Sequence, residues 1–388
     1  MKFSFDLLPS ARRPHVSVAG VNSSRRDFMK FVGVGVAAVG AGTVLAGCSD
    51  TSSSGQTVAE TGGVLASNAL AEPTKFVVGS AAGDNFLIDV VNKEQGNFAS
   101  YNLSVPDLLF PSSSVQANQL LASGALGGCM TDITLAINAF ANSTPGQRPV
   151  VVGLRVPVNT YSVVVGKGSW PAESASFEDK MNALRGKRIG VTALGAGADQ
   201  QLIMALEAAG IPERDVTRIG VGQISPAIAQ MSAGRLDGYV GYSRGASLAV
   251  AHQAKGSLLA NFADPGTPET LRNQVVGAVV VREDFARSNP EVVKAWLAAQ
   301  EEGQSWIEAN PEAAAALLNK NSFDGKMQEP ANQSIRFFRE TVFPSAKPMF
   351  QVPRDSIELM VGLAEKQGLI APGTVHYEDL VPDYARAQ

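Results

Sequence analysis

The segments LASGALGG (residues 121–128) and MSAGRLDG (residues 231–238) lie 110 residues apart and align without a gap. In each, the end of a helical pattern is followed by a glycine, a leucine and the start of an apolar run. Gly124 and Gly234 occupy the position where many helices end in a left-handed residue. Such joints are common in α/β proteins, so one segment alone predicts little. Together with matching strand–loop–helix openings before each segment, the pair predicts two similar lobes.

Short apolar runs alternate with helical stretches on both sides of these segments, a pattern typical of βαβ units and parallel-rich sheets. The predicted strands are Lys75–Ser80, Asp107–Phe110, Leu126–Met130, Lys187–Val191, Val216–Val221, Gly238–Gly241 and Ser257–Phe262. The predicted helices begin near Asp84 and at Ile133, and otherwise cover Val115–Ala122, Ala198–Ala209, Pro226–Ala233 and Ala246–Ala254. The predicted fold class is therefore α/β with two lobes.

Two β-rich segments, residues 149–165 and 275–281, flank the second lobe and are candidates for strands that cross between the lobes. The chain would leave the first lobe, build the second, and return to finish the first with helices. We therefore expect residues 74–155 and 275–388 in the first lobe and residues 156–274 in the second. A central cleft would lie at the carboxyl ends of the strands, where open α/β sheets bind ligands.

Three dipeptides predict helix starts, because each places an N-cap residue before a proline that suits the first helical turn. They are Ser225-Pro226, Asn289-Pro290 and Asn310-Pro311. After residue 281 the pattern is helical to the end of the chain.

The N-terminal segment has the features of an export signal. Residues 24–30 (SRRDFMK) resemble the bacterial twin-arginine motif, and residues 31–47 (FVGVGVAAVGAGTVLAG) follow without a charge. Because this run is short and rich in glycine, a signal peptide over residues 1–47 is favoured over a permanent membrane anchor. The run ends in LAGC, which resembles a lipobox with Cys48 as the acylated residue. The alternative is a chance cysteine beside an ordinary cleavage site.

Residues 48–73 are rich in Ser, Thr, Gly and Ala and have no apolar period, which predicts a flexible tether. A lipid on Cys48 would hold the protein at a membrane surface without a spanning helix. The expected location is the periplasm or the cell surface. Ser49 follows the cysteine, and the sequence leaves open which membrane carries the anchor.

Composition argues against several functions. The whole chain has a net charge of −4 and residues 1–47 carry +4, so residues 48–388 carry −8. Such an acidic protein is a poor partner for nucleic acid. Beyond the signal peptide and Cys48, the chain has one cysteine, Cys129, and two histidines, His252 and His376. An internal disulfide and a multi-histidine metal site therefore cannot form, and we predict no cofactor.

Several motifs, in their order along the chain, resemble periplasmic solute-binding proteins of the nitrate, sulfonate, taurine and pyrimidine-precursor ABC importers (the NMT1/THI5-like group). LRGKRIGV at residues 184–191 resembles the start of that family's second lobe. Residues 121–128 and 232–238 are similar to its repeated glycine–acid segment. NPEVVKAW at residues 289–296 and NPEA at residues 310–313 resemble its C-terminal helices. The resemblance extends over about residues 74–340.

The resemblance implies a type II binding-protein fold with hinge strands, a small-molecule solute, and ABC permease and ATPase subunits as partners; we expect a monomer. The sequence departs from the family pattern at Gly127, where an acid is usual, and at residues 241–244 (GYSR), where many members have an acid–proline pair. The second loop would touch the ligand, so the family's usual ligands are not carried over. The cysteine cluster and paired histidines of the related pyrimidine-synthesising enzymes are absent.

Candidate ligand-binding residues lie where helix N-termini meet strand ends, because free N–H groups and the helix dipole favour an anion there. Arg244 would hold a carboxylate or sulfonate by two contacts, the alternative being a solvated surface arginine. Asp132 either bonds the solute or caps the next helix. The candidates are Ser80, Ala81, Asp84, Asn85, Thr131, Asp132, Gly195, Ala196, Tyr242 and Arg244, with Arg155 and Tyr161 as weaker ones.

The predicted function is capture of a small organic anion (nitrate-, sulfonate- or carboxylate-like, or pyrimidine-related) by hinge closure of the cleft, without catalysis. Two alternatives stay open. One is an exported hydrolase-type enzyme, for which the sequence offers no nucleophile elbow and no metal-ligand spacing. The other is a ligand-sensing receptor subunit on the same fold.

Overall fold

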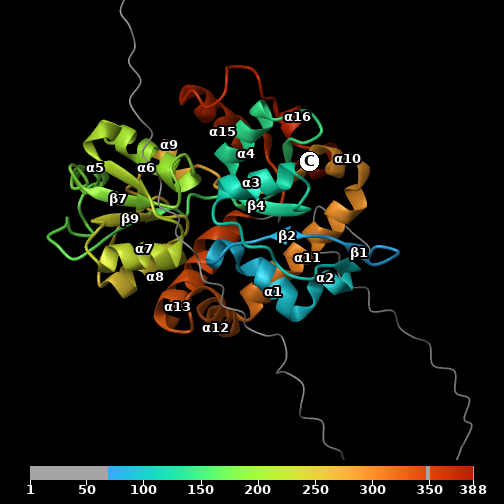
Figure 1. The fold of residues 1–388 in the computed structure, drawn as a ribbon, viewed down its shortest axis with the longest axis horizontal. Helices are drawn as coiled ribbons and strands as arrows, with labels where there is room; N and C mark the ends of the chain where they lie inside the picture. Colours follow the sequence, from blue (N-terminus) through green and yellow to red (C-terminus); the bar gives the residue numbers. More distant parts are fainter. Residues whose placement is uncertain (1–68, 347–349, 388) are drawn as a thin grey trace, which may run out of the picture. The chain divides into compact units, whose positions relative to one another are not determined.

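The computed structural model describes residues 69–346 and 350–387; the predicted signal peptide, Cys48 and most of the predicted tether lie outside them. Two β-sheets organise the described chain (Figure 1). One has four strands in the order β2-β4-β11-β5, and the other has five in the order β10-β6-β9-β7-β8. We call each sheet with its helices the four-stranded lobe and the five-stranded lobe. The predicted two-lobe α/β fold is confirmed.

The four-stranded lobe uses segments from both ends of the described chain. Its strands are β2 (Val78–Gly79), β4 (Gly128–Asp132), β5 (Pro149–Val156) and β11 (Gly277–Arg282). Its helices are α1 (Leu87–Gln95), α2 (Asn97–Ser100), α3 (Ser114–Ala122), α4 (Ile133–Asn142), α10 (Glu283–Ser288), α11 (Pro290–Ala309), α15 (Arg354–Lys366) and α16 (Tyr377–Leu380). A separate parallel pair is formed by β1 (Thr74–Lys75) and β3 (Leu103–Ser104).

The five-stranded lobe is built from one continuous stretch, drawn green to yellow in Figure 1. Its strands are β6 (Ser162–Val165), β7 (Arg188–Val191), β8 (Thr217–Gly220), β9 (Gly238–Gly241) and β10 (Ser257–Asn261). Its helices are α5 (Phe177–Asn182), α6 (Gly197–Ala208), α7 (Ile224–Ser232), α8 (Arg244–Ala254) and α9 (Glu269–Arg272).

Both sheets are mixed, which corrects the expectation of parallel-rich sheets. Strands joined by helices pair in parallel, namely β2 with β4 and β7 with β8 and β9. The strands that adjoin the two connections between the lobes, residues 157–161 and 262–276, pair antiparallel: β5 with β11, and β10 with β6. A strand that enters from the other lobe has no helical crossover to force it parallel.

Two backbone hydrogen bonds tie the connections together where they leave each sheet. The Val276 N–H donates to the Val156 carbonyl at 3.1 Å, beside the four-stranded sheet. The Phe262 N–H donates to the Tyr161 carbonyl at 3.0 Å, beside the five-stranded sheet. The crossing strands predicted from sequence therefore end within their own sheets, and the short connections between these two bonds form the candidate hinge.

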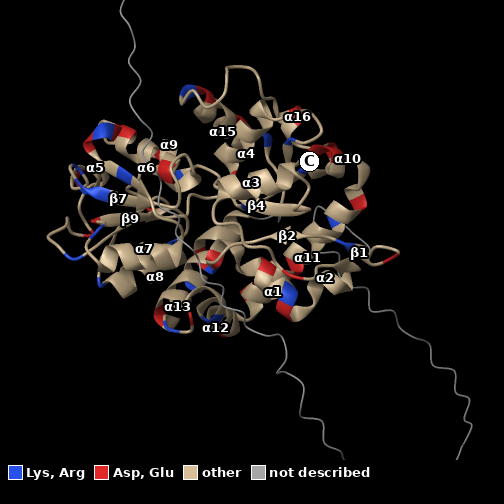
Figure 2. Ribbon diagram, viewed as in Figure 1, with Lys and Arg blue, Asp and Glu red and all other residues tan. Residues whose placement is uncertain are grey.

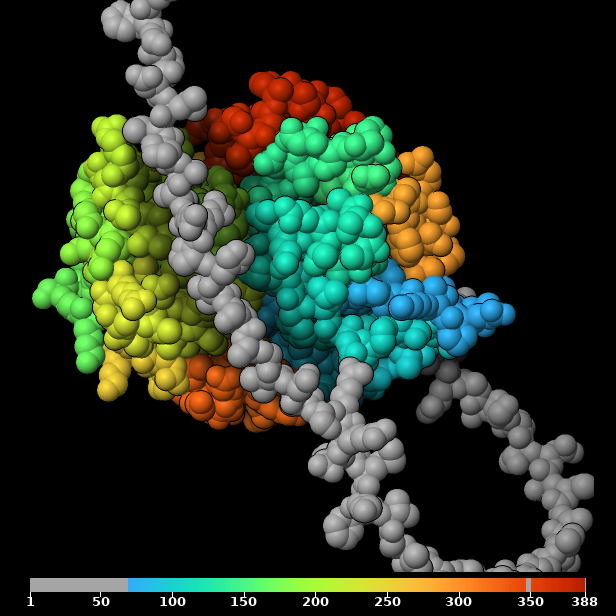
Figure 3. Space-filling model, in the orientation of Figure 1, coloured from blue at the N-terminus to red at the C-terminus, as the bar shows by residue number. Residues whose placement is uncertain are grey.

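The helices that follow α11 contact both lobes. Helix α12 (Pro311–Ser322) lies against α1, and α13 (Gln328–Phe337) packs on α8 of the five-stranded lobe. Buried Ile335 and Phe338 share one hydrophobic core with Val250 of α8. Figure 3 shows the orange surface of this segment against the yellow-green surface of the five-stranded lobe. Helices α12 and α13 therefore connect the two lobes by packing on a helix of each.

Glycines end two helices in the way the repeated segments predict. Gly124 after α3 and Gly234 after α7 have φ of +77° and +66°, in the left-handed region that favours glycine. One predicted strand is wrong: residues 107–110 contribute a single bridge, between Leu109 and Gly79, rather than a strand. The run of four residues there is short, and its partner β2 has only two residues to pair with.

Two of the three predicted N-cap residues precede their helices, but their side chains do not form the capping hydrogen bond. Asn289 and Asn310 precede α11 and α12, yet neither side chain caps its helix. The Asn310 Nδ2 instead donates back to the Trp306 carbonyl at 2.9 Å, which satisfies the end of α11. Ser225 is not an N-cap, because α7 already begins at Ile224. A residue between two helices can serve either one, and sequence does not say which.

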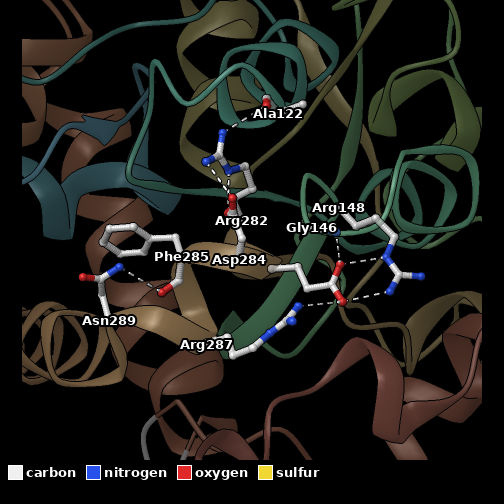
Figure 4. A network of polar contacts seen from close by, with 9 residues as sticks. Ala122, Gly146, Arg148, Arg282, Asp284, Phe285, Arg287 and Asn289 are labelled. Carbon is white, nitrogen blue, oxygen red and sulfur yellow. Dashed lines mark hydrogen bonds and ion pairs between the residues drawn. The ribbon is translucent and has the colours of Figure 1, made fainter.

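Charged side chains fasten the turn from β11 into α10 (Figure 4). Arg148 donates to the Glu283 carboxylate from Nη2 at 2.9 Å and from Nε at 3.0 Å, and Arg287 lies 3.5 Å from the same group. Arg148 holds the pKa of Glu283 below its usual range. Arg282 pairs with Asp284 at 2.6 Å. Partly exposed pairs of this kind stabilise a fold by about 0–1 kcal/mol each, so most of the stability comes from the apolar cores.

Among the described residues, no helix combines the length and the hydrophobicity that crossing a bilayer requires.

Candidate functional site

A cavity lies between the two lobes at the carboxyl ends of β2, β4, β7 and β9, where ligands bind in open α/β sheets. The cavity volume is about 50 Å³. The narrowness of the space favours a small ligand. The residues that line it are Gly79, Ser80, Ala81, Asn85, Phe86, Pro111, Ser113, Ser114, Ala117, Cys129, Met130, Thr131, Asp132, Tyr161, Thr192, Gly197, Ala198, Gln223, Tyr242 and Val276.

The structure brings most of the predicted site residues to this cavity. Those on its wall are Ser80, Ala81, Asn85, Thr131, Asp132 and Tyr242. Those not on its wall are Asp84, Gly195, Ala196 and Arg244. Sequence reasoning missed Thr192 and Gln223, although the first follows a predicted strand and the second precedes a predicted helix. The same strand-end rule, applied to every strand, would have found both.

Asp84 joins the two lobes instead of lining the cavity. It lies in the turn before α1 and is 3% exposed. Its carboxylate accepts hydrogen bonds from the Gly245 N–H at 2.9 Å and from the hydroxyls of Ser243 and Ser334. Because Ser243 and Gly245 form the N-terminus of α8, the acid of one lobe caps a helix of the other.

Asn85 and Tyr242 form a second set of contacts across the cleft. The Asn85 Nδ2 donates to the Tyr242 carbonyl at 3.0 Å and to the Thr160 hydroxyl at 3.3 Å. The Tyr242 hydroxyl in turn donates to the Ala82 carbonyl. These bonds reach from the β2–α1 loop to the end of β9, so they hold the lobes together on one side of the cavity.

Asp132 caps α4, which is one of the two roles that its position in the sequence allows. Its Oδ1 accepts from the Thr134 N–H at 2.9 Å, and its Oδ2 accepts from the Tyr161 hydroxyl at 3.0 Å. Burial raises the pKa of Asp132 and also raises that of Tyr161. The pair therefore links the end of β4 to the hinge connection while its oxygens border the cavity.

The N-terminus of α6 reaches the cavity from the five-stranded lobe. Its N-cap residue, Ala196, has no side chain to satisfy the first N–H groups, and the next residues, Gly197 and Ala198, lie on the cavity wall. A Cβ added to Gly197 would fall 2.6 Å from the Asp132 Oδ2 and would clash with the Tyr161 hydroxyl. Glycine is thus required where α6 meets the four-stranded lobe.

The arginines predicted to serve the ligand have other partners. The Arg244 guanidinium lies over the Phe337 ring, 5.2 Å from its centroid. Arg155 is buried in the four-stranded lobe, where its Nη2 pairs with the Asp89 Oδ1 at 2.8 Å. No lysine, arginine or histidine is among the described residues that line the cavity. A small organic anion would therefore find the dipole of α6 there but no cationic side chain.

Charge is sparse around the cavity. Figure 2 shows α3, α4 and α7 in tan, and Asp132 is the one charged residue among the described residues on the cavity wall. Burial raises the pKa of the Cys129 thiol, also on the wall, to about 12. Within residues 69–346 and 350–387 no three His, Cys, Asp or Glu side chains lie close enough together to hold a metal ion.

Comparison with solved structures finds the same fold in bacterial binding proteins. The alkanesulfonate-binding protein SsuA from Xanthomonas axonopodis pv. citri, bound to MOPS, superposes with a TM-score of 0.61 at 18% identity, over 80% of this chain and 99% of that one. The aliphatic sulphonate binding protein SsuA from Escherichia coli gives 0.57 at 19% identity, over 78% and 96%. The nitrate-binding protein NrtA from Synechocystis PCC 6803 gives 0.54 at 19% identity, over 65% and 67%.

No curated protein sequence matches the chain significantly. A family model does: the one described as NMT1/THI5 like matches residues 84–314. The match begins at Asp84, includes both connections between the lobes and ends in α12, and it covers more than half of the chain. The chain belongs to the NMT1/THI5-like family.

Proposed function

We propose that this protein is the extracytoplasmic solute-binding component of an ABC importer, and that it captures a small solute in the cavity between its lobes. The main support for the proposal is the cavity. Strand ends and helix starts of both lobes line it, and hydrogen bonds join the two lobes beside it. Solved proteins of the same fold that bind alkanesulfonates or nitrate support it.

Capture requires the lobes to separate and close again. The two connections, residues 157–161 and 262–276, link the lobes and are the hinge of this movement; their end bonds join Val276 to Val156 and Phe262 to Tyr161. In the closed state the cross-lobe bonds of Asp84 and Asn85 are made. A solute that contacts both lobes shifts the equilibrium toward closure by its differential affinity for the closed state.

We infer that the protein binds its solute without chemical turnover. Cys129 is the strongest nucleophile type on the cavity wall, but a pKa near 12 leaves almost none of it as thiolate at neutral pH. Neither Asp132 oxygen is free to act as a base while Thr134 and Tyr161 donate to them. Incubation with a bound ligand, followed by mass spectrometry, should return the ligand unchanged; a product would favour the enzyme alternative.

We further propose that residues 1–47 direct twin-arginine export and that Cys48 carries a lipid. This would place the binding protein, as a monomer, beside permease and ATPase subunits. Cys48→Ala should move the exported protein from the membrane fraction to the soluble fraction, because a lipid is the predicted attachment. If the variant still sediments with membranes, the lipid proposal fails.

A thermal-shift screen tests solute capture directly. The panel should contain nitrate, sulfonates, carboxylates, pyrimidines and neutral amides. A ligand at 100 times its Kd stabilises the folded state by about 2.7 kcal/mol, which a melting curve resolves. Isothermal titration should then give one site per chain. A protein that responds to none of several hundred small solutes would count against the proposal.

A further inference from the structure

Two polar side-chain atoms on the cavity wall have no hydrogen-bond partner among the described residues. They are the Oδ1 of Asn85 and the Oγ1 of Thr131. Asn85 is 4% exposed and Thr131 is 1% exposed. Buried polar groups are nearly always hydrogen-bonded in folded proteins. Two such groups in the wall of one cavity therefore point to a ligand that supplies their partners.

The chemistry that Asn85 demands follows from its other contacts. Its amide could be placed either way round, but one neighbour, the Tyr242 carbonyl at 3.0 Å, can only accept a hydrogen bond. The –NH₂ group must therefore face Tyr242, and the Oδ1 must be the atom left without a partner. Since Oδ1 is an acceptor, the ligand has to bring an N–H or O–H group to it.

Thr131 is less restrictive. A hydroxyl either donates or accepts, so the ligand atom that meets it is of either kind. Nitrate and alkanesulfonates have acceptor oxygens, which satisfy Thr131, but they have no donor for Asn85. A primary amide or sulfonamide has both an –NH₂ donor and an oxygen acceptor.

The charged groups on the cavity wall place a second condition on the ligand. Asp132 is a buried carboxyl there, and no described lysine, arginine or histidine shares the wall with it. The remaining positive features are the N-termini of α3, α6 and α7, which also reach the wall and are each equivalent to about half a charge. An anion would have to leave water for a site without a cationic side chain, which is unfavourable. A neutral ligand meets no such penalty.

We propose that the cavity selects a neutral small solute that donates an N–H or O–H group to Asn85 and makes a further hydrogen bond with Thr131. This inference rests on the proposed function, since it names the solute class of the same site. It differs from the small anion that the helix N-termini alone suggest. Asn85 and Thr131 are accordingly the residues that set specificity.

Matched pairs of ligands test the inference on the purified protein. Methanesulfonamide and methanesulfonate, propionamide and propionate, and benzamide and benzoate differ chiefly in donor and charge. Titration calorimetry should show at least one neutral member binding more tightly than its anionic mate by about tenfold or more, the ratio expected for one buried hydrogen bond.

Thr131→Val removes the hydroxyl with little change of shape and should weaken that neutral ligand about tenfold. Without ligand its melting temperature should stay the same or rise, because the hydroxyl has no partner in the described part of the chain. Tyr377→Phe is the matched control. Tyr377 is also buried, but its hydroxyl donates to the Val352 carbonyl at 2.6 Å, and Tyr377 is not on the cavity wall. That variant should melt lower and bind like the wild type, and Thr131→Ser should retain binding.

The outcomes separate the two proposals. Tighter binding of the anionic members overturns the neutral-solute inference and leaves solute capture standing. Equal binding of the neutral ligand by wild type and Thr131→Val overturns it as well. If neither these pairs nor any solute of the wider panel binds, solute capture itself fails, and the inference with it.

Discussion

The replacement Asp84→Ala should shift the protein toward an open state. The Asp84 carboxylate accepts three hydrogen bonds, two of them from Ser243 and Gly245 at the start of α8 in the other lobe. A hydrogen bond to a charged group contributes about 1.5–3 kcal/mol. Taking the two cross-lobe bonds at the lower value, the closed state loses about 3 kcal/mol. If closure is needed for tight binding, that loss lowers solute affinity by about 100-fold.

Small-angle X-ray scattering and calorimetry measure the two effects separately. The variant should show a larger radius of gyration without ligand and weaker binding, while its circular dichroism spectrum stays that of the wild type. Asp237→Ala is a suitable control. Asp237 also accepts three hydrogen bonds, but all come from Arg188 inside the five-stranded lobe. An Asp84→Ala protein with wild-type affinity and dimensions would refute the idea that this contact governs closure.

Three further predictions concern single residues. Arg155→Met leaves Asp89 buried without its cation and should lower the free energy of unfolding in urea by about 3–5 kcal/mol. Adding Asp89→Leu should recover much of this loss. An unchanged unfolding midpoint for Arg155→Met alone would contradict the prediction. Gly197→Ala pushes a methyl group against the Tyr161 hydroxyl, so calorimetry should show weaker solute binding and the unfolding free energy should fall by about 1–3 kcal/mol. Burial raises the pKa of Glu301 from 4.5 to about 7, so its contribution to stability is full below pH 4.5 and is lost as the pH rises through 7. Glu301→Gln should therefore raise the melting temperature at pH 8 but not at pH 4.5, and an equal gain at both would contradict the assignment.

Much of the fold is predictable from local pattern. The alternation of strands and helices follows from hydrophobic periodicity, and Gly124 and Gly234 mark helix ends because only glycine takes a positive φ without strain. The candidate site residues at strand ends were found by the same reasoning, since loops after parallel strands meet at one edge. The mixed pairing of the hinge strands was not predictable, because it depends on the route of the chain between lobes.

The sequence by itself determined the α/β class, the two lobes, the family motifs and the group of polar loops that borders the cavity. Only the tertiary structure decided what each polar group does. Arg155 and Arg244 have the same charge in the sequence, yet one is buried against Asp89 and the other stacks on Phe337. Asp84 joins the lobes because Ser243 and Gly245, 159 and 161 residues later in the chain, lie beside its carboxylate. The strength and role of a polar group depend on which partners and how much water surround it, and folding brings those partners from distant parts of the chain.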